Sequence, residues 1–287
     1  MTVMSGMTVQ AAPSPDKNGM VVHLTRREAC WEYVSFAVWR LTAGQRVEDN
    51  TGDEEVGLVI LSGKVTVRSS SGNWDEIGER QNVFEGKPYV VYLPPQTSFA
   101  LTAVTDCDVA RAGAMAEHGM EARLITPEQI TEDLRGEGNA QRRVRHVLEA
   151  DQPAEHLFLV EVLTPSGNWS SYPPHKHDTN NPPHETYLEE IYYHRVRPPQ
   201  GFGFQRVYTD DGRLDEAVVI EDGMVVMVPK GYHPAVVAPG YELYYLNVMA
   251  GPIREWRFVD DVHHRWVSEG WKPYGSQETD SAAVSPE

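Results

Sequence analysis

Two histidines separated by a single residue have the spacing in this sequence that best suits metal chemistry. His175 and His177 follow Pro173 and Pro174 in YPPHKHD, and the prolines favour an extended backbone. On an extended strand, residues i and i+2 point to the same face, so both imidazoles can reach one metal ion. The spacing therefore predicts a metal-binding pair.

A carboxylate and a third histidine complete the predicted site. Glu190 begins the strand-like run EIYYHRV, and 12 residues separate it from His177. His233 follows a tight turn in VPKGYHPAVV. Three imidazoles and one carboxylate suit a first-row divalent ion and leave positions open for a substrate. The residues alone leave the choice of carboxylate open between Glu185, Glu189 and Glu190.

Length and charge limit the classes of protein to consider. The 287 residues suggest about two domains. Lys and Arg number 25 against 42 Asp and Glu, and the net charge of −17 argues against nucleic-acid or anionic-membrane partners. No signal-peptide pattern and no apolar run of roughly 20 residues is visible. With Cys30 and Cys107 read as free thiols, we expect a cytoplasmic protein.

Short β-rich runs separated by Gly, Pro, Asp and Asn predict a sandwich or barrel. One helix is expected in ITPEQITEDL, with Thr126 as N-cap, Pro127 at the first helical position and Gln129 completing a capping box. The basic segment QRRVRHVLEA follows. We interpret it as a solvated strand or connector rather than an anion-binding site, because charge runs are commonly exposed.

The two halves of the chain show a weak internal similarity. EEVGLVILSG can be laid over EEIYYHRVRP, which aligns Glu55 with Glu190. YLPPQTSFAL can be laid over VPKGYHPAVV, which aligns Ser98 with His233. A duplication would make the first half structural and place the metal in the second half, while chance similarity between β-rich segments is the alternative.

The metal-site pattern resembles the two sequence motifs of cupins, although the gap after His177 is longer and PKGYH one residue shorter than usual. A more specific resemblance lies in WSSYPPHKHD, GFGFQRVY, VPKGYHPAVVAPGYELYYLNVMAG and GERQNVFEGKPYVVYLPP. These segments resemble the 5-deoxy-glucuronate isomerase family of bacterial inositol catabolism, from about Trp31 to about Trp266. That family is similar to the 5-keto-4-deoxyuronate isomerases, bicupins whose metal glutamate opens an E-[IV]-Y strand, and this likeness selects Glu190.

The resemblance implies an all-β fold of two tandem cupin barrels, that is, double-stranded β-helices or jelly rolls, with a short connecting helix. The expected parts are a disordered leader over residues 1–19, a metal-free cupin-like barrel over 20–120, a helix and connector over 121–150, a metal-binding cupin barrel over 151–273, and a disordered tail over 274–287. Edge strands of such barrels would allow a homo-oligomer.

The resemblance also implies an enzyme that converts 5-deoxy-glucuronate, a small sugar acid, into 5-dehydro-2-deoxy-gluconate. One divalent ion would act as a Lewis acid in this aldose–ketose isomerisation. Zinc is the first expectation, and manganese, iron, cobalt or nickel would suit the same ligands. A cupin dioxygenase with redox-active iron and a non-catalytic sugar-acid-binding protein are the alternatives.

Three further residues are predicted to serve catalysis or binding. Alternation along the strand from Glu190 places Tyr192 on the metal's face, and Lys230 is expected to reach the mouth from the turn before His233. Arg206 is expected to bind the substrate carboxylate. Tyr192 as barrel lining and Arg206 as a surface charge are the alternatives. The polar, Pro-rich residues 178–189 form either a lid or a plain solvent loop.

Overall fold

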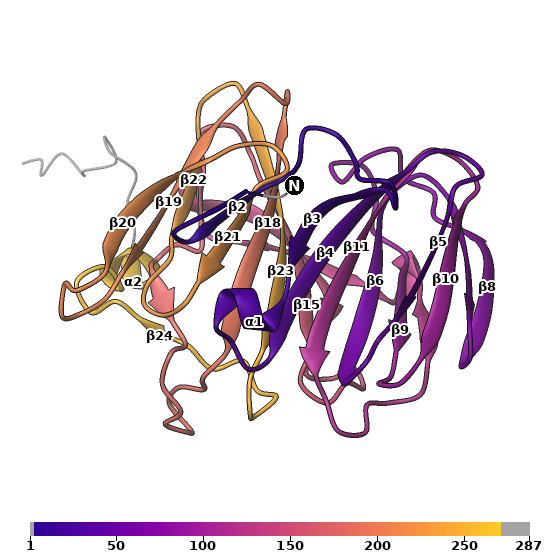
Figure 1. Ribbon diagram of the computed structural model, residues 1–287. Helices are drawn as coiled ribbons and strands as arrows, with labels where there is room; N and C mark the ends of the chain where they lie inside the picture. The colour runs from indigo at the N-terminus through magenta and orange to yellow at the C-terminus, as the bar shows by residue number, and fades with distance from the viewer. Residues whose placement is uncertain (1–2, 271–287) are drawn as a thin grey trace, which may run out of the picture.

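Two β-barrels lie side by side in the computed structural model, which describes residues 3 to 270 (Figure 1). The first barrel combines a six-stranded sheet, in the order β12-β9-β6-β11-β4-β3, with a four-stranded sheet, β5-β10-β7-β8. Its strands are β3 Met20–Leu24, β4 Val34–Leu41, β5 Arg46–Asn50, β6 Glu54–Ser62, β7 Val65–Ser69, β8 Gly72–Ile77, β9 Val90–Leu93, β10 Ser98–Ala103, β11 Cys107–Met115 and β12 Arg123–Ile125.

The second barrel combines an eight-stranded sheet, β1-β2-β21-β18-β23-β15-β14-β13, with a four-stranded sheet, β16-β22-β19-β20, and a two-stranded ribbon, β17-β24. Its strands are β1 Val3–Ser5, β2 Thr8–Gln10, β13 Thr131–Arg135, β14 Arg142–Leu148, β15 Phe158–Thr164, β16 Trp169–Ser170, β17 His175–Lys176, β18 Glu189–Arg197, β19 Gly203–Tyr208, β20 Asp215–Ile220, β21 Val225–Val228, β22 Ala235–Val237, β23 Glu242–Ala250 and β24 Val259–Asp260.

Helical segments are short. They are α1 Arg26–Ala29, α2 Trp266–Gly270 and two 3-10 turns, η1 Pro127–Gln129 and η2 Gly138–Ala140. Within residues 3 to 270, no helix has the length and apolar character needed to cross a membrane.

Strand alternation builds three apolar cores. On β15, Phe158, Val160 and Val162 point into the second barrel, while Leu159 points toward the first barrel. Successive strand residues face opposite sides, so a strand between two packed layers is apolar on both faces. Each fully buried large side chain stabilises the fold by about 1.5–3 kcal/mol. This arrangement confirms the predicted all-β fold of two tandem barrels.

The N-terminal segment corrects one expectation, because residues 3–10 form a β-hairpin rather than a disordered leader. β2 pairs with β21 of the second barrel through Thr8 opposite Val226 and Val9 opposite Val225. Val9 is buried in the core between the barrels. The hairpin extends the edge of the second barrel's large sheet, a partner that the local sequence does not reveal. The predicted disordered tail, residues 274–287, lies outside the described residues.

The connector differs from its prediction as well. The backbone N–H of Thr126 donates to Gln129 Oε1 at 2.8 Å, as the capping pattern predicted. The helical turn nevertheless ends at Gln129, and β13 begins at Thr131 because it pairs with β14. β12 joins the first barrel, whereas β13 and β14 join the second. Arg145 of β14 is buried, so this basic segment is not a solvated strand.

Candidate functional site

Three of the four predicted metal ligands lie together, with two imidazoles against one oxygen of the carboxylate. His177 follows β17, Glu190 lies in β18, and His233 follows the turn after β21. His177 Nε2 and His233 Nε2 each lie 3.1 Å from Glu190 Oε2, and all three side chains are buried. Their ligand atoms lie within 4.8 Å of one another, a grouping that no other His, Cys, Asp or Glu residues match in the part of the chain that the structure describes.

Backbone carbonyls hold both imidazoles in a fixed orientation. His177 Nδ1 lies 3.2 Å from the carbonyl of Leu188, and His233 Nδ1 lies 2.8 Å from the carbonyl of Gly231. A ring nitrogen that faces a carbonyl carries the proton, which leaves Nε2 as the unprotonated atom toward the centre. Asn247 Nδ2 donates to Glu190 Oε1 and orients the carboxylate in the same way.

The donor set fits a metal cation. His233 Nε2 is buried and makes no hydrogen bond. Two imidazole lone pairs and a carboxylate oxygen repel one another unless a proton or a cation lies between them. Two nitrogens and one oxygen at this separation suit a first-row divalent ion.

His175 lies beside this trio rather than within it. Its ring centroid is 4.9 Å from that of His233 and 6.3 Å from that of His177, and Phe258 packs against it at 4.8 Å. The side chain lines the adjoining cavity. Its place as a fourth ligand stays a prediction.

Burial and mutual charge set the protonation of the cluster. Burial would raise the pKa of Glu190, but the neighbouring His233 and His177 outweigh it and lower that pKa below its usual value. Burial disfavours the charged form of His177, yet the hydrogen bond and charge of Glu190 raise its pKa. Burial lowers the pKa of His233, and burial together with the other two histidines holds the pKa of His175 well below its usual value.

A cavity of about 750 Å³ opens over the cluster. This volume lies within the roughly 300–1,000 Å³ of small-molecule sites. Its floor carries polar and aromatic groups, and its walls combine apolar strand residues with charged residues. The lining includes His175, Glu190, Tyr192, Tyr245, Asn247, Val144, Val160, Val162, Ser171, Trp256, Phe258, Arg135, Arg142 and Asp260.

Two arginines that the sequence analysis did not select line this cavity. Arg142 Nη1 donates to the carbonyls of Tyr172 at 3.0 Å and Ala140 at 3.1 Å, which fixes the guanidinium in place, and burial lowers its pKa. Arg135 lines the same wall, with its guanidinium 5.7 Å from the ring centroid of Trp256. Both arise in the β13–β14 region. The sequence feature that could have identified Arg142 is its alternation with Val144, which is buried.

Hydroxyl groups form a connected set at the cavity floor. Tyr192 OH lies 2.9 Å from Ser171 Oγ, and Tyr245 OH lies 2.5 Å from Ser170 Oγ and 3.4 Å from Ser171 Oγ. Burial and the charge of Glu190 raise the pKa of Tyr192 well above its usual value. Tyr192 does face the cluster, as strand alternation predicted, and its catalytic role stays a prediction.

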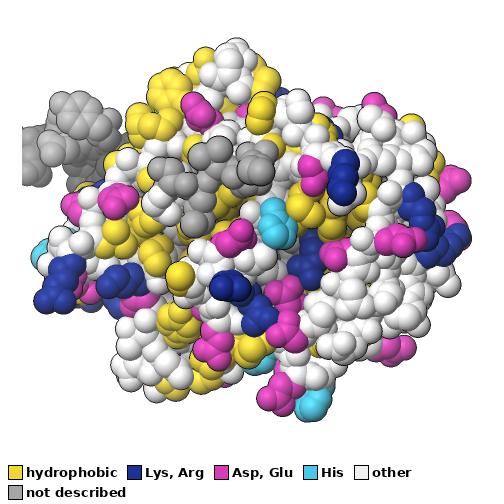
Figure 2. Space-filling view, in the orientation of Figure 1, with side chains coloured by type: hydrophobic (Ala, Val, Ile, Leu, Met, Phe, Trp, Pro, Cys, Tyr) yellow, Lys and Arg dark blue, Asp and Glu magenta, His cyan; other side chains and the backbone are white. Residues whose placement is uncertain are grey.

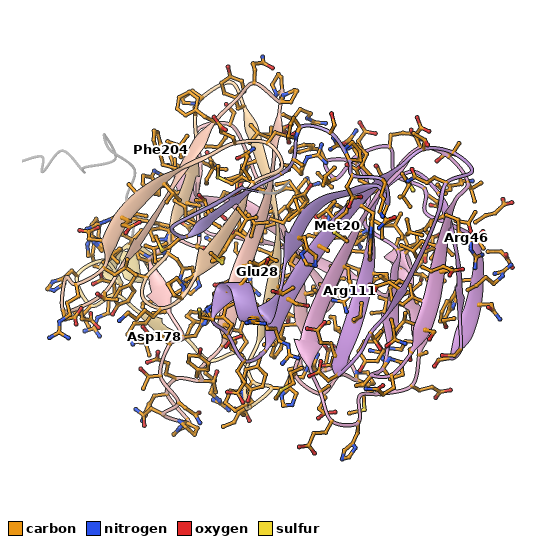
Figure 3. The ribbon with its side chains drawn as sticks, viewed as in Figure 1. Met20, Glu28, Arg46, Arg111, Asp178 and Phe204 are labelled. Atoms are coloured by element: carbon orange, nitrogen blue, oxygen red, sulfur yellow. The ribbon has the colours of Figure 1, made fainter. Side chains whose placement is uncertain are left out.

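Arg206 and Lys230 are not brought to the cavity. Gln205 and Val207 point into the barrel, so Arg206 points outward from β19, as Phe204 does (Figure 3). Arg206 binds Asp215 through two hydrogen bonds of 2.7 and 2.8 Å. Hydrophobic side chains gather at the upper left of Figure 2, over the region where Figure 1 draws β19 and β22. Lys230 is exposed in its turn. Strand alternation corrects the expectation that Arg206 faces the substrate. Lys230 does not line the cavity, and its catalytic role stays a prediction.

Residues 178–189, the predicted lid, do not line the cavity. Lys176 Nζ binds Asp178 at 2.8 Å and Glu185 at 3.1 Å, which closes the segment on itself. Asp178, labelled in Figure 3, also accepts a hydrogen bond of 2.8 Å from the N–H of Gly231, in the turn that carries His233. The segment therefore braces a ligand-bearing turn.

The strand registers correct the overlay of the two barrels. β9 places Leu93 opposite Val56, and β21 places Val228 opposite Glu190. In the overlay of YLPPQTSFAL with VPKGYHPAVV, Leu93 and Val228 stand at the same position, each directly before a proline. Val56 is therefore the counterpart of Glu190. The sequence overlay aligned Glu55 with Glu190 and was therefore one residue out of register. At the position that corresponds to Glu190, the first barrel has the apolar Val56.

Known proteins resemble the chain over most of its length. A model of the KduI/IolB family matches residues 8–267. A protein of Geobacillus thermodenitrificans named 5-deoxy-glucuronate isomerase is 50% identical over 257 residues, which are 89% of this chain and 94% of the relative. A protein of the same name from Bacillus subtilis strain 168 is 44% identical over 87% of this chain and 93% of its own length.

Solved structures support the same fold. An IolB-like protein from Salmonella typhimurium LT2 superposes with a TM-score of 0.88 and 43% identity, over 92% of this chain and 100% of that protein. The oxalate decarboxylase of Lactobacillus farciminis superposes with a TM-score of 0.63 at 10% identity, over 93% of this chain and 91% of that enzyme. The second likeness bears on the fold alone, and it agrees with a bicupin.

Proposed function

The chain belongs to the KduI/IolB family, and from that premise we propose that it isomerises 5-deoxy-glucuronate to 5-dehydro-2-deoxy-gluconate in inositol catabolism. The family resemblance and the isomerase class predicted from the sequence are confirmed by relatives that share 44 to 51% identity and carry this name. The observation that carries the proposal is the convergence of His177, Glu190 and His233 beneath a cavity walled by Arg142.

One divalent metal ion is proposed to be held by His175, His177, Glu190 and His233. Zinc is the first choice, and manganese, iron, cobalt or nickel suit the same nitrogen and oxygen donors. When bound, such an ion would supply Lewis-acid stabilisation for negative charge that develops on the substrate oxygens at C1 and C2.

The chain's own residues then bind the substrate and move its protons. Arg142, with Arg135 beside it, is proposed to hold the substrate carboxylate, since a guanidinium matches a carboxylate in two hydrogen bonds. Tyr192 and Ser171 are proposed to hold a proton that exchanges with the substrate's oxygens, because their hydroxyls meet at the cavity floor. The apolar walls at Val144, and those formed by β15, restrict water.

The proposal extends to partners and location. The net charge of −17 disfavours nucleic acid and anionic membranes, while Arg135 and Arg142 supply the local positive charge that a small sugar acid requires. The free thiols Cys30 and Cys107 support the cytoplasm as the proposed location. A homo-oligomer formed through the strand edges is part of the same proposal.

The experiment that tests the function is a proton NMR assay with 5-deoxy-glucuronate under anaerobic conditions. Metal-loaded protein is expected to replace the aldehyde signal with that of the ketose product. Glu190→Gln is expected to lose turnover and bound metal together, while His118→Ala, a change at an exposed histidine of the first barrel, is expected to keep both. Turnover that requires oxygen would favour a dioxygenase. Full metal occupancy without conversion would reject the proposed substrate.

A further inference from the structure

A second cavity, of about 560 Å³, opens between the two sheets of the first barrel. Its volume is in the roughly 300–1,000 Å³ range of ligand sites. Residues of β3, β4 and β11 line one side and Asp49 of β5 lies on the other. Figure 3 labels Met20 and Arg111 on this side of the barrel. Here β11 places Arg111 opposite Leu58, as β23 places Asn247 opposite Tyr192, so the cavity is the first barrel's counterpart of the metal cavity.

The polar part of this cavity is a buried network rather than a metal cluster. Arg111 Nη1 lies 2.8 Å from Glu54 Oε2 and donates to Ser35 Oγ at 3.1 Å. Ser35 Oγ donates in turn to Glu54 Oε2 at 2.9 Å. Arg111 Nε lies 3.3 Å from the carboxylate of Asp49 and is buried without a hydrogen bond. The network therefore presents closely spaced donors and acceptors, while Arg111 Nε is buried against Asp49 and does not face the cavity.

A glycine leaves the space that this network occupies. A Cβ on Gly113 would lie 2.5 Å from Ser35 Oγ, 2.6 Å from Glu54 Oε2 and 2.8 Å from Arg111 Nη1. Such distances are shorter than real carbon contacts, so a larger residue would displace the network. The space is thus a consequence of glycine at this position of β11.

Aromatic residues complete the lining. Trp31 and Trp39 line the cavity, together with His23 and Phe36. Aromatic surface combined with a few fixed polar groups is the usual composition of a small-molecule site. Two of the three arginines in the lining, Arg26 and Arg111, are paired with Asp53, Glu54 and Asp49, which offsets their charge. The third, Arg27, is exposed, so solvent screens its attraction for an anionic ligand.

We propose that this cavity binds a neutral, polyhydroxylated small molecule of monosaccharide size. The ligand's hydroxyls would exchange hydrogen bonds with Arg111, Glu54 and Ser35, and its carbon faces would pack against Trp31 and Trp39. This site is separate from the proposed active site and would remain if the substrate of the second barrel were different.

Saturation-transfer NMR and calorimetry on the full-length protein test the proposal, with D-glucose, D-galactose and D-mannitol as neutral probes and D-glucuronate as the anionic probe. At least one neutral probe is expected to bind with millimolar or tighter affinity. Arg111→Gln is expected to weaken it at least tenfold and Ser35→Ala at least threefold. Arg46→Gln, which removes an exposed arginine of the same barrel outside the cavity, is expected to leave binding unchanged.

Three results would overturn the proposal. The first is that no neutral probe binds at roughly 50 times a millimolar Kd, a concentration at which a millimolar site would be almost fully occupied. The second is equal affinity in wild type, Arg111→Gln and Ser35→Ala, since the hydroxyl variant removes a single oxygen and should fold. The third is a tenfold preference for D-glucuronate, or loss of neutral-probe binding in His177→Ala, which would place the probe in the second barrel.

Discussion

We expect recognition of an anionic substrate to depend most on Arg142. Its guanidinium is fixed by two backbone carbonyls and lines the cavity. We expect Arg142→Gln to lower kcat/KM about 10- to 100-fold, mainly through KM, since hydrogen bonds to charged groups contribute roughly 1.5–3 kcal/mol. Steady-state kinetics with 5-deoxy-glucuronate measure this. Arg206→Gln is the control and should match wild type, because Arg206 points outward to Asp215. If Arg206→Gln lowered kcat/KM and Arg142→Gln did not, the expectation that Arg206 binds the substrate carboxylate would be restored.

The hydroxyl of Tyr192 can be tested apart from its ring. Tyr192→Phe keeps the ring that packs 5.8 Å from His233 and removes the oxygen that meets Ser171. General acid–base catalysis is typically a 10²–10⁴-fold effect, so kcat should fall by about that factor. Metal content, measured by elemental analysis, should not change. Tyr208→Phe, whose hydroxyl binds Asp261, serves as the control. A Tyr192→Phe variant with normal kcat would leave Tyr192 as barrel lining.

Sequence spacing predicted the grouping of His177, Glu190 and His233 better than the residues that line the cavity, for a physical reason. His175 and His177 share a face through local strand geometry, and their partners carry recognisable local patterns. Alternation with Val144 indicates which face of β14 carries Arg142, but the place of β14 between β13 and β15 in the sheet is a long-range contact that no local pattern encodes. Arg206 was misplaced because alternation along β19 depends on which residue faces the core, and Gln205, a polar residue, is the buried one.

At the scale of elements, the segment after β17 and the turn before His233 act as one unit. Asp178 accepts from the N–H of Gly231, whose carbonyl accepts from His233 Nδ1. Residues that orient a metal ligand typically change affinity 10- to 100-fold when altered. We therefore expect Asp178→Ala to weaken metal binding by about that factor, as measured by competition with a chelator. Asp211→Ala, in the exposed β19–β20 turn, should have no effect.

An unchanged metal affinity in Asp178→Ala would mean that the turn holds its shape without this brace, and the segment would then be a plain solvent loop.

Long-range pairing explains which strands the sequence analysis missed. The β1–β2 hairpin and β13 are strands because they complete the edges of the second barrel's large sheet. Thr8 and Val9 pair with residues more than 200 positions away, so local propensity indicated only a polar leader.

At the scale of the whole molecule, charged groups are buried between the barrels beside the apolar core that the two barrels share. Glu161 of the second barrel lies between Arg80 of the first barrel, at 2.7 Å, and Arg145, at 3.2 Å, and accepts from Tyr244 OH at 2.8 Å. A buried carboxylate is tolerated when its oxygens are fully hydrogen-bonded. The arrangement fixes how the two large sheets face each other and, through β15 and β23, fixes one wall of the metal cavity.

Two further glutamates bind the barrels reciprocally. Glu189 of the second barrel accepts from the backbone N–H groups of residues 32–34, at 2.8 to 2.9 Å. Glu55 of the first barrel accepts from those of residues 155–157, at 2.6 to 2.9 Å. These glutamates hold matching positions in the two strand registers, each preceding the position of Val56 or Glu190. The two barrels thus use carboxylates at matching strand positions to bind each other, and the carboxylate of the candidate metal site follows this position in the second barrel only.

This reciprocity gives a prediction for stability. Glu55→Ala should lower the free energy of unfolding by about 3–5 kcal/mol, because it leaves three N–H groups at the barrel interface without their acceptor. Glu55→Gln keeps one acceptor oxygen and should cost less. Glu242→Ala, which breaks an exposed ion pair with Arg197, should cost no more than about 1 kcal/mol. Urea unfolding followed by tryptophan fluorescence measures all three. Equal urea midpoints for Glu55→Ala and Glu242→Ala would show that apolar packing alone joins the barrels. Two separate unfolding transitions in Glu55→Ala would show that this carboxylate makes the two barrels unfold as one.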